Sequence, residues 1–379
     1  MAHYKMSDVV TEVNERENNP ANSKYDRFVG LEHYVSGEVI IRNYGSTERL
    51  ESTMKVFQAG DILVARRNVY LKRASTVDFD GLTSGDSIVL RAKDPEIGRI
   101  LPFVLNTDDF WDFADQYSDG TMSKRLSPKT LMTFEFDLPD GDELSKLADI
   151  LWAANDTRES YQALLKQADE LVKSQFIELF GDPVRNEKGW PMVRLDEVTE
   201  IKIGPFGSLL HKEDYIENGH ALINPSHIAD GRIAADCKLT VSDAKYAELS
   251  SYALHVDDIV LGRRGEMGRC AVVYEDGYLC GTGSMIIRPK DKMKPYFLQN
   301  ILSSPSYRKV IESKAVGVTM MNINVPIVSS LLIPQLPIEL QEDYLCFVRQ
   351  LDKSKFELKQ AIANISELMK SLIQQDFSN

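Results

Sequence analysis

Gly60-Asp61-Ile62-Leu63-Val64-Ala65-Arg66-Arg67-Asn68 returns later in the chain as Asp257-Asp258-Ile259-Val260-Leu261-Gly262-Arg263-Arg264-Gly265. The offset between Asp61 and Asp258 is 197 residues. Each copy has a short apolar run, typical of a buried strand, that leads into a pair of arginines. In a chain of 379 residues, a repeat at this distance predicts two similar domains related by a pseudo-two-fold internal repeat.

The repeat extends well beyond this stretch. At the same offset, Ala74 corresponds to Ala271, Ser87 to Ser284, and Arg91-Ala92-Lys93-Asp94 to Arg288-Pro289-Lys290-Asp291. With a slip of one residue, the matching pairs are Thr121-Met122 with Thr319-Met320, Pro128 with Pro326, and Leu138-Pro139 with Leu336-Pro337. Most of the chain is therefore expected to be built twice.

Each repeat ends in a segment that predicts a long helix, at about 142–180 and 339–377. Neither segment contains an internal glycine or proline, and both are rich in residues that favour helix. Apolar residues follow a 4-3 spacing in both, and the basic interruptions Arg158 and Lys355 fall at the same step. This pattern predicts one antiparallel coiled-coil pair acting as a spacer. The alternative is two amphipathic helices, each packed on its own domain. Phe180-Gly181-Asp182-Pro183 should end the first helix, because glycine suits the position after a helix and proline prevents its continuation.

The rest of the chain, 1–137 and 183–335, is expected to fold as mixed α/β. Runs at Ile62–Ala65, 87–91, Ile259–Gly262 and 284–288 predict strands. Segments 108–116, 243–250, 296–303 and 305–312 predict helices. Short strands with irregular turns favour a curved, partly barrel-like sheet. His33-Tyr34 and Ser226-His227 precede turns at Gly37 and Gly231 and are interpreted as surface polar residues.

Composition restricts the class of protein. Hydrophobic content of 43% and charged content of 27% are ordinary for a folded protein. No apolar run approaches the roughly 18–20 residues that cross a bilayer. The four cysteines have no metal-binding spacing and are expected to be free thiols in a reducing cytoplasm. The net charge of −13 opposes binding to DNA by this chain alone, since phosphate contacts need lysine and arginine.

Several motifs, in this order and duplicated, resemble the specificity subunit of a type I restriction–modification system. They include Gly189-Trp190-Pro191 after the first helix, Ile203-Gly204-Pro205-Phe206-Gly207-Ser208, and the Asp257–Gly265 stretch quoted above. At the exit lie Ile333-Pro334-Gln335-Leu336-Pro337 and then Glu339-Leu340-Gln341, which opens the helix. The first repeat departs from the pattern, because it lacks the Trp-Pro entrance and has Asn68 where the second has Gly265.

The resemblance implies a domain order. It gives a target recognition domain at 1–137, a central conserved helix at 138–182, a second target recognition domain at 183–335 and a C-terminal conserved helix at 336–379. It also implies a role, namely recognition of a bipartite, asymmetric sequence in double-stranded DNA. Two modification subunits would dock on the helices and methylate adenine with S-adenosylmethionine, and restriction or motor subunits would join through them. The chain itself would bind no cofactor or metal and would catalyse nothing alone.

Candidate DNA-binding residues follow from the repeat and from loop chemistry. Arg66-Arg67 and Arg263-Arg264 follow equivalent strands, where a loop can meet phosphate or guanine O6 and N7. The alternative is that one arginine of each pair faces solvent while the other makes a structural salt bridge. Loop lysines, arginines and asparagines are added because they read bases or phosphates, and Ser208 and Lys212 because 204–212 could hold a phosphate or form a tight turn. These added residues are Lys72, Arg73, Lys124, Arg125, Ser208, Lys212, Arg269, Asn322 and Asn324.

Candidate partner-binding or coiled-coil residues are those at the repeating positions of the two long helices. In the first helix they are Leu147, Leu151, Tyr161, Leu165 and Val172. In the second they are Tyr344, Val348, Leu351, Leu358, Ile362, Ile365 and Met369.

Enzymatic functions have weak support in the sequence. Asn224-Pro225-Ser226-His227 differs from the Asn-Pro-Pro-aromatic motif of amino-methylating enzymes at its last two positions. The chain has no phosphate-binding loop that ends in Lys-Ser or Lys-Thr. The main alternative to DNA recognition is a non-catalytic protein–protein adaptor with two similar domains on a coiled coil, which the acidic balance favours.

Overall fold

The computed structural model describes residues 1–120, 123–205, 209–229, 231–265, 267–317 and 322–377. Its contacts divide the chain into two compact units. The first unit comprises Met1–Leu164 and Glu357–Asn379, and the second comprises Leu165–Phe356. Each long helix thus contributes one stretch to either unit.

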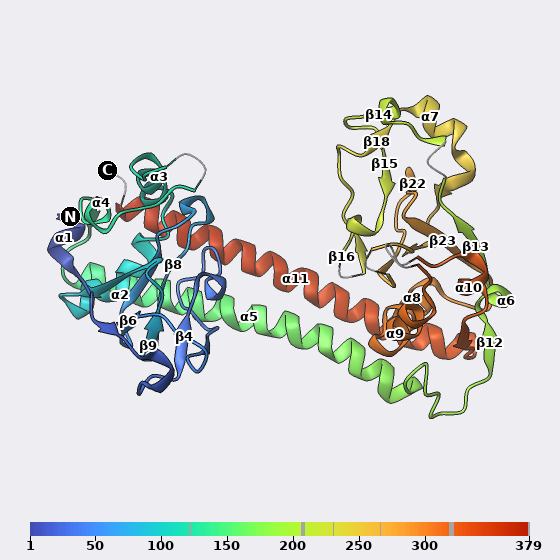
Figure 1. Cartoon of the computed structure of the whole chain (residues 1–379), viewed down its shortest axis with the longest axis horizontal. Coiled ribbons are helices and arrows are strands. Elements are labelled where there is room, and N and C mark those ends of the chain that lie inside the picture. The colour runs from blue at the N-terminus through green and yellow to red at the C-terminus, as the bar shows by residue number, and fades with distance from the viewer. Residues whose placement is uncertain (121–122, 206–208, 230, 266, 318–321, 378–379) are drawn as a thin grey trace. The chain divides into compact units, whose positions relative to one another are not determined.

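The first unit contains a four-stranded sheet, a five-stranded sheet and a two-stranded ribbon (Figure 1). All neighbours in the four-stranded sheet are antiparallel, in the order β2 (Val10–Glu12), β10 (Ser87–Ala92), β7 (Ile62–Ala65) and β8 (Ala74–Thr76). The five-stranded sheet has the order β3 (Arg16–Glu17), β6 (Met54–Phe57), β9 (Gly81–Thr83), β4 (Arg27–Val29) and β5 (Gly45–Ser46). The ribbon pairs β1 (Ala2–Lys5) with β11 (Glu135–Leu138).

The second unit has sheets of the same sizes and one further two-stranded ribbon. Its four-stranded sheet has the order β13 (Thr199–Ile203), β23 (Ser284–Pro289), β20 (Ile259–Gly262) and β21 (Cys270–Val272). Its five-stranded sheet has the order β14 (Tyr215–Ile216), β18 (Thr240–Val241), β15 (His220–Ile223), β22 (Tyr278–Cys280) and β19 (Ala253–Leu254). β12 (Met192–Arg194) pairs with β24 (Leu332–Pro334), and β16 (Ile228–Ala229) pairs with β17 (Arg232–Ile233).

The four-stranded sheets have the same strand order in both units, which confirms the predicted mixed α/β fold and its internal repeat. The five-stranded sheets differ at one edge, because β3 pairs with β6 in the first unit, whereas β14 pairs with β18 in the second. In each five-stranded sheet, one central pair is parallel, β4 with β9 and β15 with β22. The predicted strands correspond to β7, β10, β20 and β23. Each unit has separate four- and five-stranded sheets, however, where the sequence favoured one curved, partly barrel-like sheet.

The register of the two copies differs by one residue at one strand. Val64 lies opposite Ile88 and Leu261 opposite Met285, so these pairs keep the offset of 197. On the other side of the same strands, Val64 lies opposite Ala74, but Leu261 lies opposite Cys270. The predicted correspondence of Ala74 with Ala271 is therefore wrong, because the connection from β20 to β21 is one residue shorter. Thr121-Met122 and Thr319-Met320 lie outside the described residues.

Short helices cover the sheets in both units. The first unit has α1 (Met6–Val9), α2 (Pro95–Val104), α3 (Asp108–Gln116) and α4 (Pro128–Leu131). The second has α6 (Leu195–Val198), α7 (Asp243–Glu248), α8 (Pro295–Ser303), α9 (Pro305–Lys314) and α10 (Val325–Ser329). The predicted helices correspond to α3, α7, α8 and α9. The sequence analysis missed α2, although Asp94 caps it through the backbone N–H groups of Glu96 and Ile97 and Pro95 begins it.

The two long helices are α5 (Asp142–Phe180) and α11 (Ile338–Phe377), drawn in green and red in Figure 1. In the first unit the start of α5 and the end of α11 share a core that includes Leu151 and Met369. In the second unit the end of α5 and the start of α11 share a core, where Tyr344 Oη donates to Val172 O at 3.4 Å. The helices are thus antiparallel within each unit. They also pack on the sheet-bearing body of that unit, so both predicted modes of packing occur.

A matched ion pair explains why two short motifs recur at the same offset. The Asp61 carboxylate accepts from Arg91 Nε and Nη2, both at 2.7 Å, and the Asp258 carboxylate accepts from Arg288 in the same way at the same distances. Both carboxylates are only 2% exposed, and each also accepts a backbone N–H from the preceding turn. Because a buried carboxylate needs this pairing, Asp and Arg recur for a structural reason.

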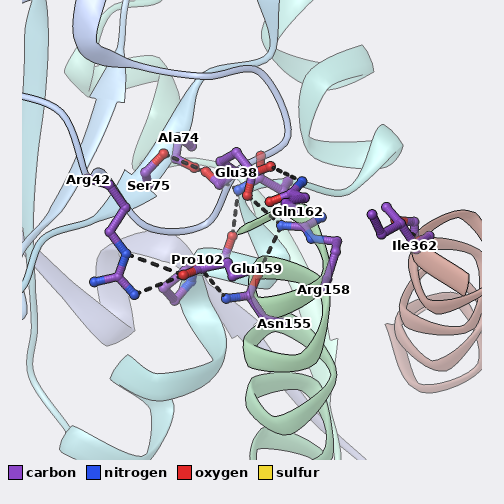
Figure 2. A network of polar contacts seen from close by, with 12 residues as sticks. Glu38, Arg42, Ala74, Ser75, Pro102, Asn155, Arg158, Glu159, Gln162 and Ile362 are labelled. Carbon is purple, nitrogen blue, oxygen red and sulfur yellow. Dashed lines mark hydrogen bonds and ion pairs between the residues drawn. The ribbon is translucent and has the colours of Figure 1, made fainter. Parts of the chain in front are cut away.

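Arg158 and Lys355, the basic residues that interrupt the 4-3 spacing of the long helices, have different kinds of partner in the two units. Figure 2 shows Arg158 on α5, where Nη2 donates to Glu38 Oε2 at 2.7 Å and to Asn155 Oδ1 at 2.9 Å. Gln162 also donates to Glu38, so the helix is joined to a loop of the globular body. In the second unit, Lys355 Nζ lies 2.7 Å from Asp352 Oδ1 and 3.0 Å from Asp169 Oδ1, and both partners are on the long helices.

The interpretation of two turn residues as surface polar groups is wrong. Tyr34 is 7% exposed, and its hydroxyl lies 2.8 Å from Ser87 Oγ. His227 is also 7% exposed, and its Nδ1 lies 2.9 Å from Leu222 O and 3.2 Å from Asn224 N. The polar atoms of these two side chains make buried contacts that stabilise the turns.

Candidate nucleic-acid interface

In the first unit, two loops predicted to bind DNA lie side by side. The residues after β7 form an isolated antiparallel bridge, Arg67 with Arg125, with the loop before α4. Arg66 N donates to Asp86 O at 2.9 Å, and Leu126 N donates to Arg66 O at 2.8 Å. The fold therefore brings together residues that are 60 positions apart in the sequence, Arg66 and Leu126.

The second unit makes the same arrangement at equivalent positions. Arg264 forms an isolated bridge with Asn322. Arg263 N donates to Gly283 O at 3.0 Å, and Ile323 N donates to Arg263 O at 3.1 Å. Each of these residues stands 197 positions after its counterpart, so the candidate interface is repeated with its backbone geometry.

The first arginine of each pair holds the loops together. Arg66 Nε donates to Leu126 O at 3.2 Å, and Arg263 Nε donates to Thr282 O at 3.1 Å. Arg263 is only 6% exposed, and burial lowers the pKa of its guanidinium, as does the charge of Arg264. Burial and the charge of Arg125 likewise lower the pKa of Arg66. The first arginine of each pair therefore has a structural role, but its printed partner is a carbonyl oxygen and not the carboxylate of the expected salt bridge.

The second arginine of each pair is exposed, and its surroundings differ between the units. Arg67 Nε lies 3.0 Å from Asp86 Oδ1, and Arg125 Nη2 donates to the same oxygen at 2.7 Å. In the second unit Gly283 stands where the first has Asp86, so that carboxylate is missing. Among the residues that the structure describes, Arg264 has no ion-pair partner.

The neighbouring basic residues are mostly engaged with their own unit. Lys72 Nζ donates to Asp108 Oδ1 at 2.6 Å, and Lys124 Nζ donates to Asp115 Oδ2 at 2.5 Å. Arg73 Nη1 donates to Leu31 O at 3.0 Å and Nη2 to Arg67 O at 3.1 Å. In the second unit, Arg269 Nη1 donates to Ile228 O at 3.2 Å. Arg73 and Arg269 thus fix the loops that Arg67 and Arg264 belong to.

The remaining candidates fall in different surroundings. Asn324 Oδ1 accepts from Ile327 N at 3.0 Å and caps α10. Asn322 Oδ1 is buried and has no hydrogen-bond partner within the described residues. Lys212 is exposed in a 3-10 turn, Lys212–Asp214, and Ser208 lies outside the described residues. Position 204 requires glycine, because a Cβ there would lie 2.1 Å from Gly281 O. This close packing of the backbone favours the tight-turn alternative for 204–212.

Asp86 is the residue that the sequence analysis missed. It lies in the turn Ser84-Gly85-Asp86 just before β10, and it is the partner of two candidate arginines. A signal was available, because Asp86 and Gly283 differ at a position where the flanking serines, Ser87 and Ser284, agree. A difference inside an otherwise repeated segment marks a place where the two units can differ in specificity.

The predicted partner-binding residues lie on the packed faces of the two long helices. Six of them are buried: Leu147, Leu151, Val172, Tyr344, Val348 and Met369. The other six are partly buried: Tyr161, Leu165, Leu351, Leu358, Ile362 and Ile365. Other apolar side chains of α5 face solvent, among them Ile150 and Leu164 in the first unit and Leu171 in the second. A partner that docks on α5 would meet this second group.

No helix in the described part of the chain is long and apolar enough to cross a membrane. The same residues contain no group of three or more His, Cys, Asp or Glu that could hold a metal ion. The cysteines that the structure describes are free thiols, and burial raises the pKa of Cys270 to about 12.

The family model of the type I restriction modification DNA specificity domain matches residues 187–367. The match to this family lies in the second repeat and the helix that follows it. A curated relative, the type I restriction enzyme MjaIX specificity subunit of Methanocaldococcus jannaschii, is 24% identical over 212 residues. That match covers 50% of this chain and 47% of the relative, so it spans about half the length of each.

Solved structures extend the likeness of fold to the first repeat of the chain. The S subunit of a type I restriction–modification system from M. genitalium has a TM-score of 0.58 and 15% identity, over 100% of this chain and 96% of that one. A chain from a study of complex assembly and conformational transition of the type I system has a TM-score of 0.57 and 19% identity. It is matched over 99% of this chain and 97% of that one. At these identities the likeness concerns the fold alone.

Proposed function

We propose that this chain is the sequence-specific DNA recognition subunit of a type I restriction–modification complex. Each unit would address one part of a bipartite, asymmetric target in double-stranded DNA. The observation that carries the proposal is the repeated pair of loops, which presents one exposed arginine in each unit on the same backbone bridge, Arg67 with Arg125 and Arg264 with Asn322. Arginine at a loop is suited to both phosphate and guanine.

The difference between the units supports the asymmetry of the target. The bridge partner is arginine in the first unit and asparagine in the second, so the two loop pairs carry different side chains on the same backbone bridge. Two identical recognition surfaces would read a symmetric sequence, whereas two surfaces that differ on equal backbones read different half-sites. Asp86 in the first unit and Gly283 in the second add to this difference.

The proposal includes partners for the long helices. Modification subunits, two in number, would dock on α5 and α11, methylate adenine with S-adenosylmethionine bound to themselves, and connect restriction or motor subunits. The chain alone would be non-catalytic and would act in the cytoplasm. Since the net charge is −13, the modification subunits would also supply much of the positive charge that DNA binding needs.

The test is selection of duplexes from a randomised DNA library by the full chain, alone and with its co-expressed modification subunits. We expect enrichment of a split sequence with the modification subunits present, and little retention of DNA by the chain alone. If neither sample enriches any sequence, DNA recognition is wrong. Assembly with protein partners without sequence preference would then support the adaptor with two similar domains.

Docking of the modification subunits can be tested on the exposed face of α5. Ile150 is 50% exposed, so Ile150→Asp places a charge on the surface and should leave the first unit folded. If this face docks, the dissociation constant for the modification subunit should rise at least tenfold, since an apolar contact is replaced by a desolvated charge. Co-purification and titration of the modification subunit measure the change.

The matched control for docking is Val35→Asp. Val35 is 52% exposed in the same unit and lies in a loop instead of on α5 or α11. It should leave the dissociation constant unchanged. Equal behaviour of the two variants would show that this part of α5 does not receive the modification subunit.

A further inference from the structure

The exposed arginine of the first unit is held in place by a carboxylate, and that of the second is not. Asp86 Oδ1 lies 3.0 Å from Arg67 Nε and 2.7 Å from Arg125 Nη2. The Asp86 side chain is 24% exposed, so it is partly shielded from water. One carboxylate oxygen therefore anchors two guanidinium groups in the same loop pair.

The contact between Asp86 and Arg67 leaves the outer nitrogens of the guanidinium, Nη1 and Nη2, accessible. Asp86 contacts Nε, at the inner end of the guanidinium, and the Arg67 side chain is 48% exposed. Within the described residues, Nη1 and Nη2 of Arg67 have no hydrogen-bond partner. Two parallel N–H groups at the outer end of a fixed planar fork match the O6 and N7 acceptors of guanine in the major groove. Because the fork is already held, less rotamer freedom is lost when it binds a base.

We propose that Arg67 reads a guanine in the half-site of the first unit and that Asp86 is its positioning residue. This inference rests on the proposed function in DNA recognition. Asp86 also reduces the net positive charge of the arginine pair, which lowers affinity for phosphate in general and favours contacts that depend on geometry. Its second oxygen, Oδ2, is a carboxylate acceptor of the kind that can bind the N4 amino group of the cytosine paired with that guanine.

The second unit provides the contrast. Gly283 occupies the position of Asp86, because Arg263 N donates to Gly283 O as Arg66 N donates to Asp86 O. Glycine has no side chain, so no carboxylate reaches Arg264 from this position. Arg264 is exposed, and its fork has no anchor among the residues that the structure describes. An exposed arginine of this kind is suited to a phosphate, where position along the backbone matters less than charge. The two second arginines thus have different tasks, although their backbones are equivalent.

The experiment compares Arg67→Lys with the matched control Arg264→Lys in the full chain with its modification subunits. Lysine keeps the charge and loses the fork. Duplexes enriched from a randomised library are sequenced, and binding of single-base variants of the selected site is measured. We expect the wild type to require guanine at one position of one half-site, and Arg67→Lys to reduce that preference roughly tenfold to a hundredfold. The other half-site should keep its preferences in Arg67→Lys, and Arg264→Lys should leave every base preference unchanged.

Asp86→Ala is the second variant and tests the positioning role. It removes no contact to a base from Arg67 itself, yet it should weaken the same guanine preference severalfold while overall retention of DNA is kept or increased. A merely structural role would instead lower binding to all sequences together.

The outcomes separate this inference from the proposed function. If the wild type enriches no sequence even with modification subunits, the proposed function fails. If it enriches a split sequence but Arg67→Lys lowers affinity equally for every sequence, or changes nothing, the reading of guanine by Arg67 is overturned while DNA recognition stands. The same holds if neither half-site contains a required guanine.

Discussion

Phe297→Ala should lower the free energy of unfolding of the second unit by about 3–5 kcal/mol. Phe297 is 0% exposed at the centre of an aromatic cluster. Its ring centroid lies 5.4 Å from that of Phe176, 5.1 Å from that of Phe180 and 6.2 Å from that of Tyr344. The loss combines transfer of a large apolar side chain with a cavity that α5, α8 and α11 cannot fill together. Native-state hydrogen exchange measures it, since amides of β20 and β23 report on this unit.

The matched control is Phe356→Ala, in which the same residue is removed from a site that is 60% exposed. Its effect should stay within about 0.5 kcal/mol. Amides of the first unit, such as those of β7 and β10, should exchange at unchanged rates in Phe297→Ala. Equal destabilisation by the two variants would mean that the aromatic cluster does not support the second unit.

Leu151→Asp should destabilise the first unit by more than about 4 kcal/mol, because it places a carboxylate without a partner in an apolar core. Leu151 is 0% exposed on α5 and belongs to the core that also contains Leu147 and Met369. Burial raises the pKa of such a carboxyl in the folded state above its unfolded value. The protein then gains stability relative to neutral pH as the pH falls through that raised pKa, since the protonated acid is less costly to bury. Denaturant unfolding at several pH values measures both effects.

Ile150→Asp is the control for this prediction, because the neighbouring side chain on the same helix points to solvent. It should leave the midpoint of unfolding nearly unchanged at every pH. A similar loss in both variants would contradict the assignment of the seam to the face that carries Leu151.

The architecture could largely be predicted from the sequence, because periodicity and repetition reflect burial directly. The run Ile62–Ala65 and the first long helix, 142–180, agree with β7 and α5 to the residue. The Asp61 and Asp258 motifs recur because each carboxylate is buried against an arginine of the neighbouring strand. Because both units need the same buried ion pair, its residues recur in both repeats and can be found by comparing them.

What the sequence could not show is where a polar side chain finds its partner. His227 was interpreted as a surface residue, since its own sequence neighbours are turn residues, but its ring is enclosed by the chain around Leu222 and Asn224. The deletion of one residue between β20 and β21 is also invisible in a pairwise match, because Ala74 and Ala271 are identical in type.

The candidate interface was predicted in part. The sequence pointed to Arg66-Arg67 and Arg263-Arg264, but it could not tell which arginine of each pair supports the loop and which faces outward. That distinction depends on carbonyl oxygens of residues far along the chain, Leu126 for Arg66 and Thr282 for Arg263. The role of each outward-facing residue on DNA remains a prediction.

Because the side chain of Arg158 on α5 is largely buried, the two globular bodies cannot be exchanged equally well. Arg158 depends on Glu38, which belongs to the body at 1–137, so a chimaera that receives a foreign body there would leave a shielded guanidinium without its carboxylate. Lys355 depends on Asp169 and Asp352, which both stay behind when 183–335 is exchanged. A designer who wishes to graft a new specificity would therefore begin with the second body, or would transfer the first together with a glutamate in the place of Glu38.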